Sequence, residues 1–179
     1  MVNKWLGNCI VSSVLITVFA GGASNGTAES VEGEDVIVKY FESRCGPGSG
    51  YEQEILEDDI DGRPYLLATY DENGNLLSES FYDENGKKCF GPEEWNSMIH
   101  RYEYTYDGNG YRTSVSDKGL DGEPVASYLP PGVHRWEWTR DDEGRMLSER
   151  MCYLNGKIRE KIYDEQGELI SERCYKPDE

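Results

Sequence analysis

The chain has 179 residues and carries 35 acidic residues against 18 lysines and arginines, which gives a formal net charge of −17. A field of this sign repels phosphates, so nucleic acids and anionic lipids are excluded as expected partners. The mean hydropathy of −0.73 predicts a thin apolar core.

Residues 1–20 have the pattern of a secretory signal peptide. Lys4 supplies one positive charge ahead of an apolar run from Cys9 to Ala20. This run is shorter than the about 20 apolar residues of a membrane-spanning helix. We therefore expect cleavage after Ala20 or Ala23, a membrane that serves only as the export route, and a secreted, periplasmic or cell-surface protein. Cleavage removes one lysine and no acid, so the mature net charge becomes −18.

Residues 21–35 lack apolar periodicity, which predicts a flexible arm. The remaining residues, 36–179, have the length of one domain.

Glycines in this domain recur at a spacing of mostly twelve residues, at positions 50, 62, 74, 86, 110, 122, 144, 156 and 167. Six of them end a turn-forming tetrapeptide: "DIDG" (59–62), "DENG" (71–74 and 83–86), "DGNG" (107–110), "DDEG" (141–144) and "DEQG" (164–167). Asp in the first position accepts backbone hydrogen bonds, and Gly in the fourth adopts the left-handed conformation, as in a type I turn that closes a hairpin. About eight residues separate the turns, enough for a strand of roughly 26 Å. The pattern predicts an all-β fold, an antiparallel β-meander of about 12-residue hairpin repeats in one twisted or curled single sheet.

Two irregular segments interrupt the repeats, at 89–99 and 125–133. Their Pro and Gly residues do not fit central strands, so we expect loops at equivalent corners of the meander.

Four cysteines follow the leader: Cys45, Cys89, Cys152 and Cys174. An even number in an exported protein indicates two disulfides, with three possible connectivities, and buried thiols are the alternative. Strands at 145–153, 157–163 and 168–175 would place Cys152 and Cys174 about 9.6 Å apart, two strand spacings. Because a disulfide spans at most about 7 Å between Cα atoms, a bridge between these two would contradict a regular meander unless a bulge or a curled end intervenes.

The motif Tyr-Asp-x-x-Gly begins at four positions: Tyr70, Tyr82, Tyr106 and Tyr163. Over residues 59–175 the chain resembles the tyrosine-aspartate (YD) repeats of the Rhs family, and MORN-like repeats are a second resemblance. The Rhs resemblance implies a β-sheet shell or an extended surface structure whose repeats carry no catalytic residues. The chain is too short to enclose a toxin and has Arg140 in place of one Tyr, so the encapsulating role is not expected.

A longer repeat places "HRYEYTY" (100–106) and "HRWEWTR" (134–140) in equivalent positions. The alternation of a strand puts four aromatic side chains on one face, Tyr102, Tyr104, Trp136 and Trp138, and Arg, Glu and Thr on the other. These aromatics either form the core or make a stacking platform for sugars, with Trp95 and Tyr128 of the irregular segments as rims. Both interpretations stay open, because a single-layer sheet cannot bury both faces.

No metal or other cofactor is predicted. His100 and His134 share a repeat position, but no Cys joins them in a ligand spacing. The acids of "EDDIDG" (57–62) are similar to half of a calcium-binding loop, but the twelfth position is Ala68 rather than Glu.

Glu103 and Glu137 have the residue type of a glycosidase pair. Arg101 and Arg135 accompany them on the same face, so we interpret both acids as members of ion pairs. No catalytic constellation stands out elsewhere, and no enzyme activity is expected.

The sequence therefore predicts a secreted, non-enzymatic β-repeat module that binds a glycan or a protein partner at the cell surface. A structural protein that assembles through its unpaired sheet edges is the main alternative, and a hydrolase is the third.

Overall fold

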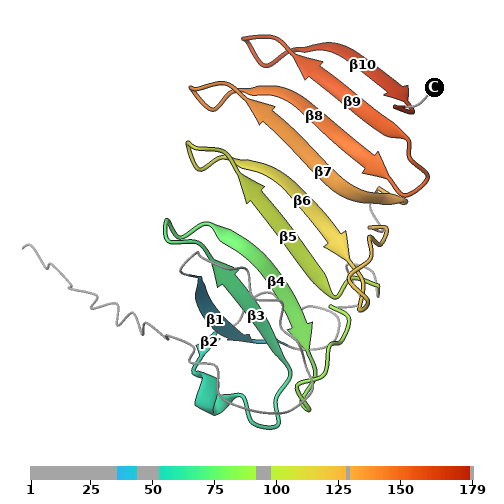
Figure 1. Cartoon of the computed structure of the whole chain (residues 1–179). Coiled ribbons are helices and arrows are strands. Elements are labelled where there is room, and N and C mark those ends of the chain that lie inside the picture. Colours follow the sequence, from blue (N-terminus) through green and yellow to red (C-terminus); the bar gives the residue numbers. More distant parts are fainter. Residues whose placement is uncertain (1–35, 44–52, 92–97, 128–129, 178–179) are drawn as a thin grey trace, which may run out of the picture. The chain divides into compact units, whose positions relative to one another are not determined.

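A computed structural model describes residues 36–43, 53–91, 98–127 and 130–177. They belong to one compact unit, Glu34–Glu179, and form one antiparallel ten-stranded sheet (Figure 1). Several predictions fall outside the described residues: the signal peptide at 1–20, the arm at 21–35, and the residues Cys45, Trp95 and Tyr128.

The ten strands and one 3-10 turn follow each other along the chain as β1 (Ile37–Glu42), β2 (Glu54–Ile55), η1 (Glu57–Asp59), β3 (Tyr65–Tyr70), β4 (Leu76–Tyr82), β5 (Arg101–Tyr106), β6 (Arg112–Lys118), β7 (Val133–Arg140), β8 (Met146–Tyr153), β9 (Ile158–Tyr163) and β10 (Leu169–Tyr175). From β3 to β10 each strand pairs with the next, so the predicted meander is confirmed. The sheet departs from it at the start, where β1 lies between β2 and β3. Within the described part of the chain, no helix has the length and apolar character needed to cross a membrane.

Five of the six acidic tetrapeptides form corners of the meander, as predicted. In the tetrapeptide at 71–74 the Asp71 amide donates to the Asn75 carbonyl at 3.0 Å, and the Gly74 amide donates to the Asp71 carbonyl at 3.0 Å. Asp71 Oδ1 accepts from the Asn73 and Asn75 amides at 3.0 and 2.7 Å. Gly74 has φ of 83°, which favours glycine. The side-chain amide of Asn75, and after it the backbone amides, lower the pKa of the Asp71 carboxyl.

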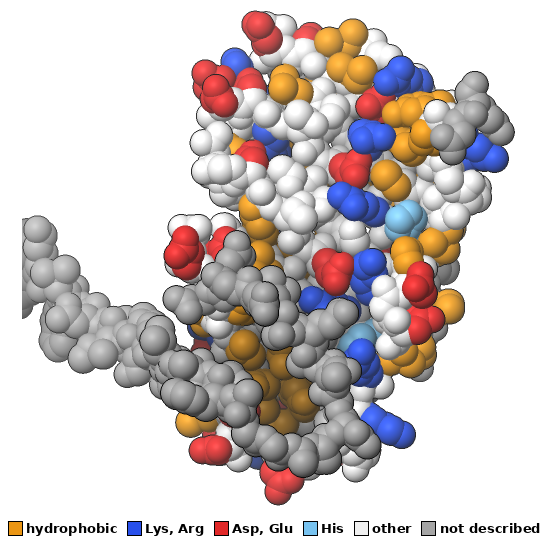
Figure 2. All heavy atoms as spheres, in the orientation of Figure 1, with side chains coloured by type: hydrophobic (Ala, Val, Ile, Leu, Met, Phe, Trp, Pro, Cys, Tyr) orange, Lys and Arg blue, Asp and Glu red, His pale blue; other side chains and the backbone are white. Residues whose placement is uncertain are grey.

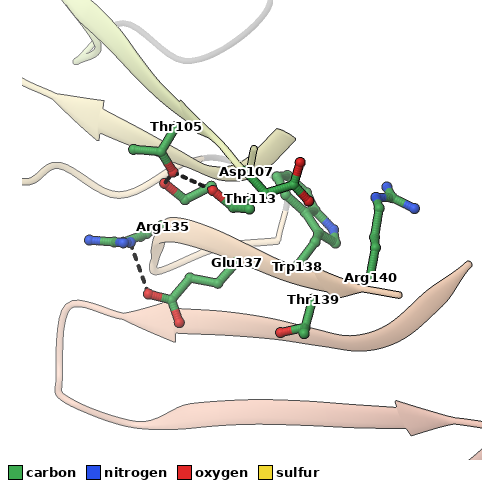
Figure 3. Close-up of a pocket in the computed structure, with 9 residues that line it drawn as sticks. Thr105, Asp107, Thr113, Arg135, Glu137, Trp138, Thr139 and Arg140 are labelled. Carbon is green, nitrogen blue, oxygen red and sulfur yellow. Dashed lines mark hydrogen bonds and ion pairs between the residues drawn. The ribbon is translucent and has the colours of Figure 1, made fainter. Parts of the chain in front are cut away.

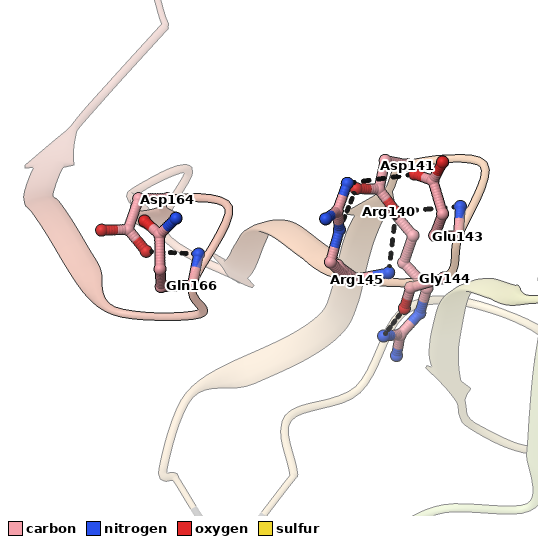
Figure 4. Close-up of polar contacts among 7 residues, drawn as sticks. All are labelled: Arg140, Asp141, Glu143, Gly144, Arg145, Asp164 and Gln166. Carbon is pink, nitrogen blue, oxygen red and sulfur yellow. Dashed lines mark hydrogen bonds and ion pairs between the residues drawn. The ribbon is translucent and has the colours of Figure 1, made fainter.

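The same arrangement recurs near the other end of the sheet (Figure 4). Asp141 Oδ1 accepts from the Glu143 amide at 3.1 Å, and Asp164 Oδ1 accepts from the Gln166 amide at 3.0 Å. The first acid of these five corner tetrapeptides therefore stabilises the turn.

The tetrapeptide at 59–62 was wrongly predicted to close a hairpin. Asp59 ends η1, and the turn that follows joins the Ile60 carbonyl to the Arg63 amide at 2.9 Å. Because β1 separates β2 from β3, this turn connects strands that are not neighbours.

The hydrophobic core is small and lies at β3 and β4. Leu66, Ala68 and Phe81 are buried there. Partly buried hydrophobic residues pack against them: Phe41, Tyr70, Leu76, Cys89 and Tyr102. Further buried apolar residues lie outside this cluster: Ile99, and Val133, Met151 and Ile158 on β7, β8 and β9.

Charged side chains on one face of the sheet form a line across β7 to β10. This first charged row consists, in cross-strand register, of Glu137, Arg150, Glu160 and Arg173. Glu137 Oε2 lies 2.8 Å from Arg150 Nη1, and Glu160 Oε2 accepts from Arg173 Nε at 2.6 Å. Acidic and basic side chains alternate along this part of the surface in Figure 2.

A second charged row runs along the other face, through Glu149, Lys161 and Glu172. Lys161 Nζ lies 3.0 Å from Glu149 Oε1, and Arg159 Nε donates to Glu172 Oε1 at 2.6 Å. Cross-strand pairs of opposite charge stabilise a sheet by about 0.2–1 kcal/mol each. They supplement the backbone hydrogen bonds where the sheet has polar residues on both faces.

The three described cysteines form no disulfide with one another. Two disulfides among four cysteines would need at least one pair within these three, so the predicted pairing is absent from the structure. Cys152 and Cys174 lie on β8 and β10 with β9 between them, as the meander predicts. Cys152 is opposite Ile158 and Cys174 is opposite Arg159, so the two thiols also lie on opposite faces.

Candidate functional site

The two long repeats lie on β5 and β7, with β6 between them. The register aligns Tyr104, Val115 and Trp136 across the three strands. Cross-strand partners share a face, so the tyrosines and tryptophans lie on the same side of the sheet, as the alternation predicts.

The two tyrosines are half-buried and contact side chains of neighbouring strands. The Tyr102 ring contacts Phe81 edge-to-face, with ring centroids 6.2 Å apart. The Tyr104 hydroxyl donates to the Glu79 carboxylate, and the Arg112 guanidinium lies 4.7 Å above the Tyr104 ring. Burial raises the pKa of Tyr102 to about 12 and raises that of Tyr104 further. Tyr102 thus packs against the core cluster, and Tyr104 is engaged by Glu79 and Arg112 of the neighbouring strands.

Two buried carboxyls flank Tyr102 in register, Glu79 on β4 and Asp117 on β6. Burial raises the pKa of Glu79, although the hydrogen bond from Tyr104 opposes this shift. Burial alone raises the pKa of Asp117 to about 7. With a strand between them and solvent excluded, these acids form part of the protein interior rather than an open catalytic pair.

The two tryptophans are arranged differently. Trp136 and Trp138 are half-buried, and their rings stack with centroids 6.2 Å apart and an interplanar angle of 17°. Trp138 also lines a groove, which Trp136 does not.

The groove arises from the way in which β6 and β7 pair. β6 and β7 pair only where Ser114–Ser116 lies opposite Arg135–Glu137. In the adjacent hairpins, β5–β6 and β7–β8, the strands pair along nearly their whole length. Beyond the short paired region, side chains from both faces reach the space between the hairpins. The resulting open groove has a volume of about 390 Å³ and is lined by Thr105, Asp107, Thr113, Ser114, Arg135, Glu137, Trp138, Thr139 and Arg140.

The lining combines one indole with hydroxyl and charged groups (Figure 3). Thr105 Oγ1 lies 2.8 Å from Thr113 Oγ1 and 2.7 Å from Ser114 Oγ, so three hydroxyls form a hydrogen-bonded chain. Asp107 accepts from two turn amides through Oδ1, which leaves Oδ2 outside these bonds. Arg140 Nη1 donates to the Gly144 carbonyl at 3.3 Å. Such a surface offers an aromatic ring for stacking and polar groups for hydrogen bonds.

Glu137 is the other acid of the groove, and both of its oxygens are engaged. Oε1 lies 3.0 Å from Arg135 Nε, and Oε2 lies 2.8 Å from Arg150 Nη1. Its repeat equivalent, Glu103, lies 3.5 Å from Arg101 Nε and 3.9 Å from Lys118 Nζ. These contacts support the ion-pair interpretation of both acids over a glycosidase pair.

Neither His100 nor His134 lines the groove. His100 is buried, its Nδ1 lies 3.0 Å from the Cys89 carbonyl oxygen, and its ring contacts Tyr82 edge-on at 5.6 Å. Burial lowers the pKa of His100 and of the half-buried His134. Among the residues that the structure describes, no three His, Cys, Asp or Glu side chains are grouped to hold a metal ion.

Of the predicted binding residues, the structure brings Trp136 and Trp138 together, and it places Tyr102 against Phe81 and Tyr104 against Glu79. Trp138 is the one lining residue that the sequence predicted as a binding residue. The other lining residues were missed, because the divergence of β6 from β7 depends on cross-strand register.

No protein-family model and no curated protein matches the sequence. The case for a function therefore rests on the groove itself.

Proposed function

We propose that this protein is an exported, non-enzymatic module that binds a cell-surface or extracellular glycan at the groove containing Trp138. The observation that carries the proposal is a half-buried indole, stacked on a second indole, beside a chain of hydroxyls and charged groups in one open groove. The leader and the YD-like motif, both properties of the sequence, support the export and the surface location.

A sugar ring suits these groups because it presents C–H groups on its face and hydroxyls around its rim. Trp138 would stack on the ring face. Asp107 and Arg140 would bond to hydroxyls at one end of the groove, and Thr105 and Thr113 at its centre. The groove is open rather than enclosed, which favours a segment of an oligosaccharide over a fully buried small ligand. The net charge of −17 opposes long-range attraction of polyanions, so we expect a neutral glycan.

Binding without turnover is proposed because the Glu137 carboxylate is held between two guanidinium groups. A general base or nucleophile needs an accessible lone pair directed at the substrate.

A glycan array that includes neutral and acidic oligosaccharides identifies the ligand, and isothermal titration then compares variants. Trp138→Ala is expected to weaken binding about tenfold, a change of about 1.4 kcal/mol, because the stacking surface is lost. Tyr163→Ala is the matched control, since Tyr163 is a half-buried aromatic on β9 outside the groove lining. We expect it to bind like the wild type.

Equal affinities of the wild type and Trp138→Ala would contradict the proposal. So would an array with no bound glycan, which would favour the protein partner or the structural role that the sequence also allowed.

A further inference from the structure

Strand β10 forms an edge of the sheet, at the far end from β1 and β2. All of its residues from Leu169 to Cys174 are exposed. Its pairing with β9 is irregular only between Leu169 and Ser171, and from Ser171 to Tyr175 the register is unbroken. An edge strand presents a line of N–H and C=O groups to which a further strand can bind.

Both charged rows end on this strand. The first row ends at Arg173 and the second at Glu172, which lie next to each other in sequence and on opposite faces. Inside the sheet the equivalent charges have a neighbouring strand on each side, whereas Arg173 and Glu172 have one on the β9 side alone.

The exposure of the side chains reflects this difference. Arg173 is 60% exposed where Arg150 of the same row is 34% exposed. Glu172 is 37% exposed where Glu149 of its row is 19% exposed. One more strand of suitable charge would complete both rows.

We propose that β10 is an interface for an antiparallel strand in which Glu is followed directly by Lys or Arg. In an antiparallel pair the residue opposite Arg173 precedes the residue opposite Glu172. The order Glu-Lys therefore places an acid opposite Arg173 and a base opposite Glu172. Strand β9 supplies this same order on the other side of β10, through Glu160 and Lys161.

A second β10 does not meet this requirement. In a strand, backbone N–H and C=O groups point to alternate sides from one residue to the next. When two copies of β10 pair antiparallel, opposed residues must both direct their N–H and C=O groups toward the other strand or both away from it. Opposed residues are therefore both even-numbered or both odd-numbered, so Glu172 cannot lie opposite Arg173. If the pairing is centred on Glu172 or on Arg173, that residue lies opposite its own copy, and two like charges meet. The partner is thus a different strand with the Glu-Lys or Glu-Arg order, and the inference does not depend on the glycan groove.

The test uses two synthetic peptides and the full protein. One peptide has the β9 sequence, residues 157–164, and the control has the same composition with its Glu-Lys pair exchanged to Lys-Glu. Fluorescence anisotropy measures the affinity of each for the wild type and for the double variant Glu172→Arg, Arg173→Glu. Two cross-strand pairs predict an about fivefold preference of the wild type for the β9 peptide. The double variant should prefer the exchanged peptide.

Hydrogen exchange of the wild type provides a second readout that needs no variant. The β9 peptide is expected to slow amide exchange in residues 171–175. Equal affinity for the two peptides, or slowed exchange confined to residues outside β10, would overturn the inference. Ultracentrifugation of the protein alone should show no dimer, and a dimer that protects the β10 amides would equally contradict it.

Discussion

Replacing Asp117 with Asn is expected to stabilise the protein at pH 8 by about 2–4 kcal/mol. Asp117 lies on β6 with 5% of its surface exposed, and burial raises its pKa to about 7 from an ordinary value of 3.8. The rise of the Asp117 pKa from 3.8 to about 7 corresponds to about 4 kcal/mol, and relaxation around the charge reduces this free energy. Asn is close in shape and remains neutral at every pH.

The pH dependence gives the sharper form of this prediction. The folded state holds the Asp117 proton more tightly than the unfolded state does. Protonated Asp117 therefore contributes its full share to the free energy of unfolding below about pH 4. It is lost as the pH rises through 7. Urea unfolding at pH 4.5 and pH 8 should therefore show a large gain for Asp117→Asn at the higher pH and a small one at the lower.

Other groups titrate in this range, but they are common to both proteins. Burial lowers the pKa values of His100 and His134, so the stability that these residues contribute is lost as the pH falls below about 6.5. This pH dependence is opposite to that of Asp117. Comparing the variant with the wild type cancels these contributions. A stability difference that is the same at both pH values would show that Asp117 is not the titrating group.

Replacing Phe81 with Ala is expected to destabilise the protein by about 3–5 kcal/mol. Phe81 is buried on β4, packs with Leu66 and Ala68, and holds the Tyr102 ring edge-on. The truncation leaves a cavity in the small core of the protein, where few other contacts compensate. Chemical denaturation measures the change.

Leu154→Ala is the control for Phe81→Ala. Leu154 is an exposed apolar residue in the β8–β9 turn, so its truncation should change the free energy of unfolding by less than about 0.5 kcal/mol. A comparable loss in both variants would mean that the apolar cluster on β3 and β4 is not the main core.

The turns and most strands could be predicted from the sequence because their signals are local. An Asp and a Gly three residues later are sufficient for the corner at Asp71–Gly74, where both the hydrogen bonds and the positive φ involve only the turn itself. The same signal was misleading at Asp59, because β1 enters the sheet between β2 and β3. That pairing joins segments distant in sequence, and no repeat marks β1.

The candidate site could be predicted only in part. Strand alternation placed the four aromatics on one face, but it could not show that Glu79 and Arg112 would engage Tyr104 from neighbouring strands. Nor could it show that β6 and β7 diverge and open a groove beside Trp138. Both features depend on cross-strand register. The even number of cysteines likewise could not show which face each thiol occupies, and the register places Cys152 and Cys174 on opposite faces.

A nuclear magnetic resonance titration of the protein with the best glycan from the array tests the central claim most directly. The account predicts that the indole N–H signal of Trp138 and the amide signals of Thr113 and Ser114 shift together and saturate, while the amides of residues 171–175 stay unchanged. Saturable binding that leaves the Trp138 signal in place, or that shifts only signals away from the groove, would contradict it.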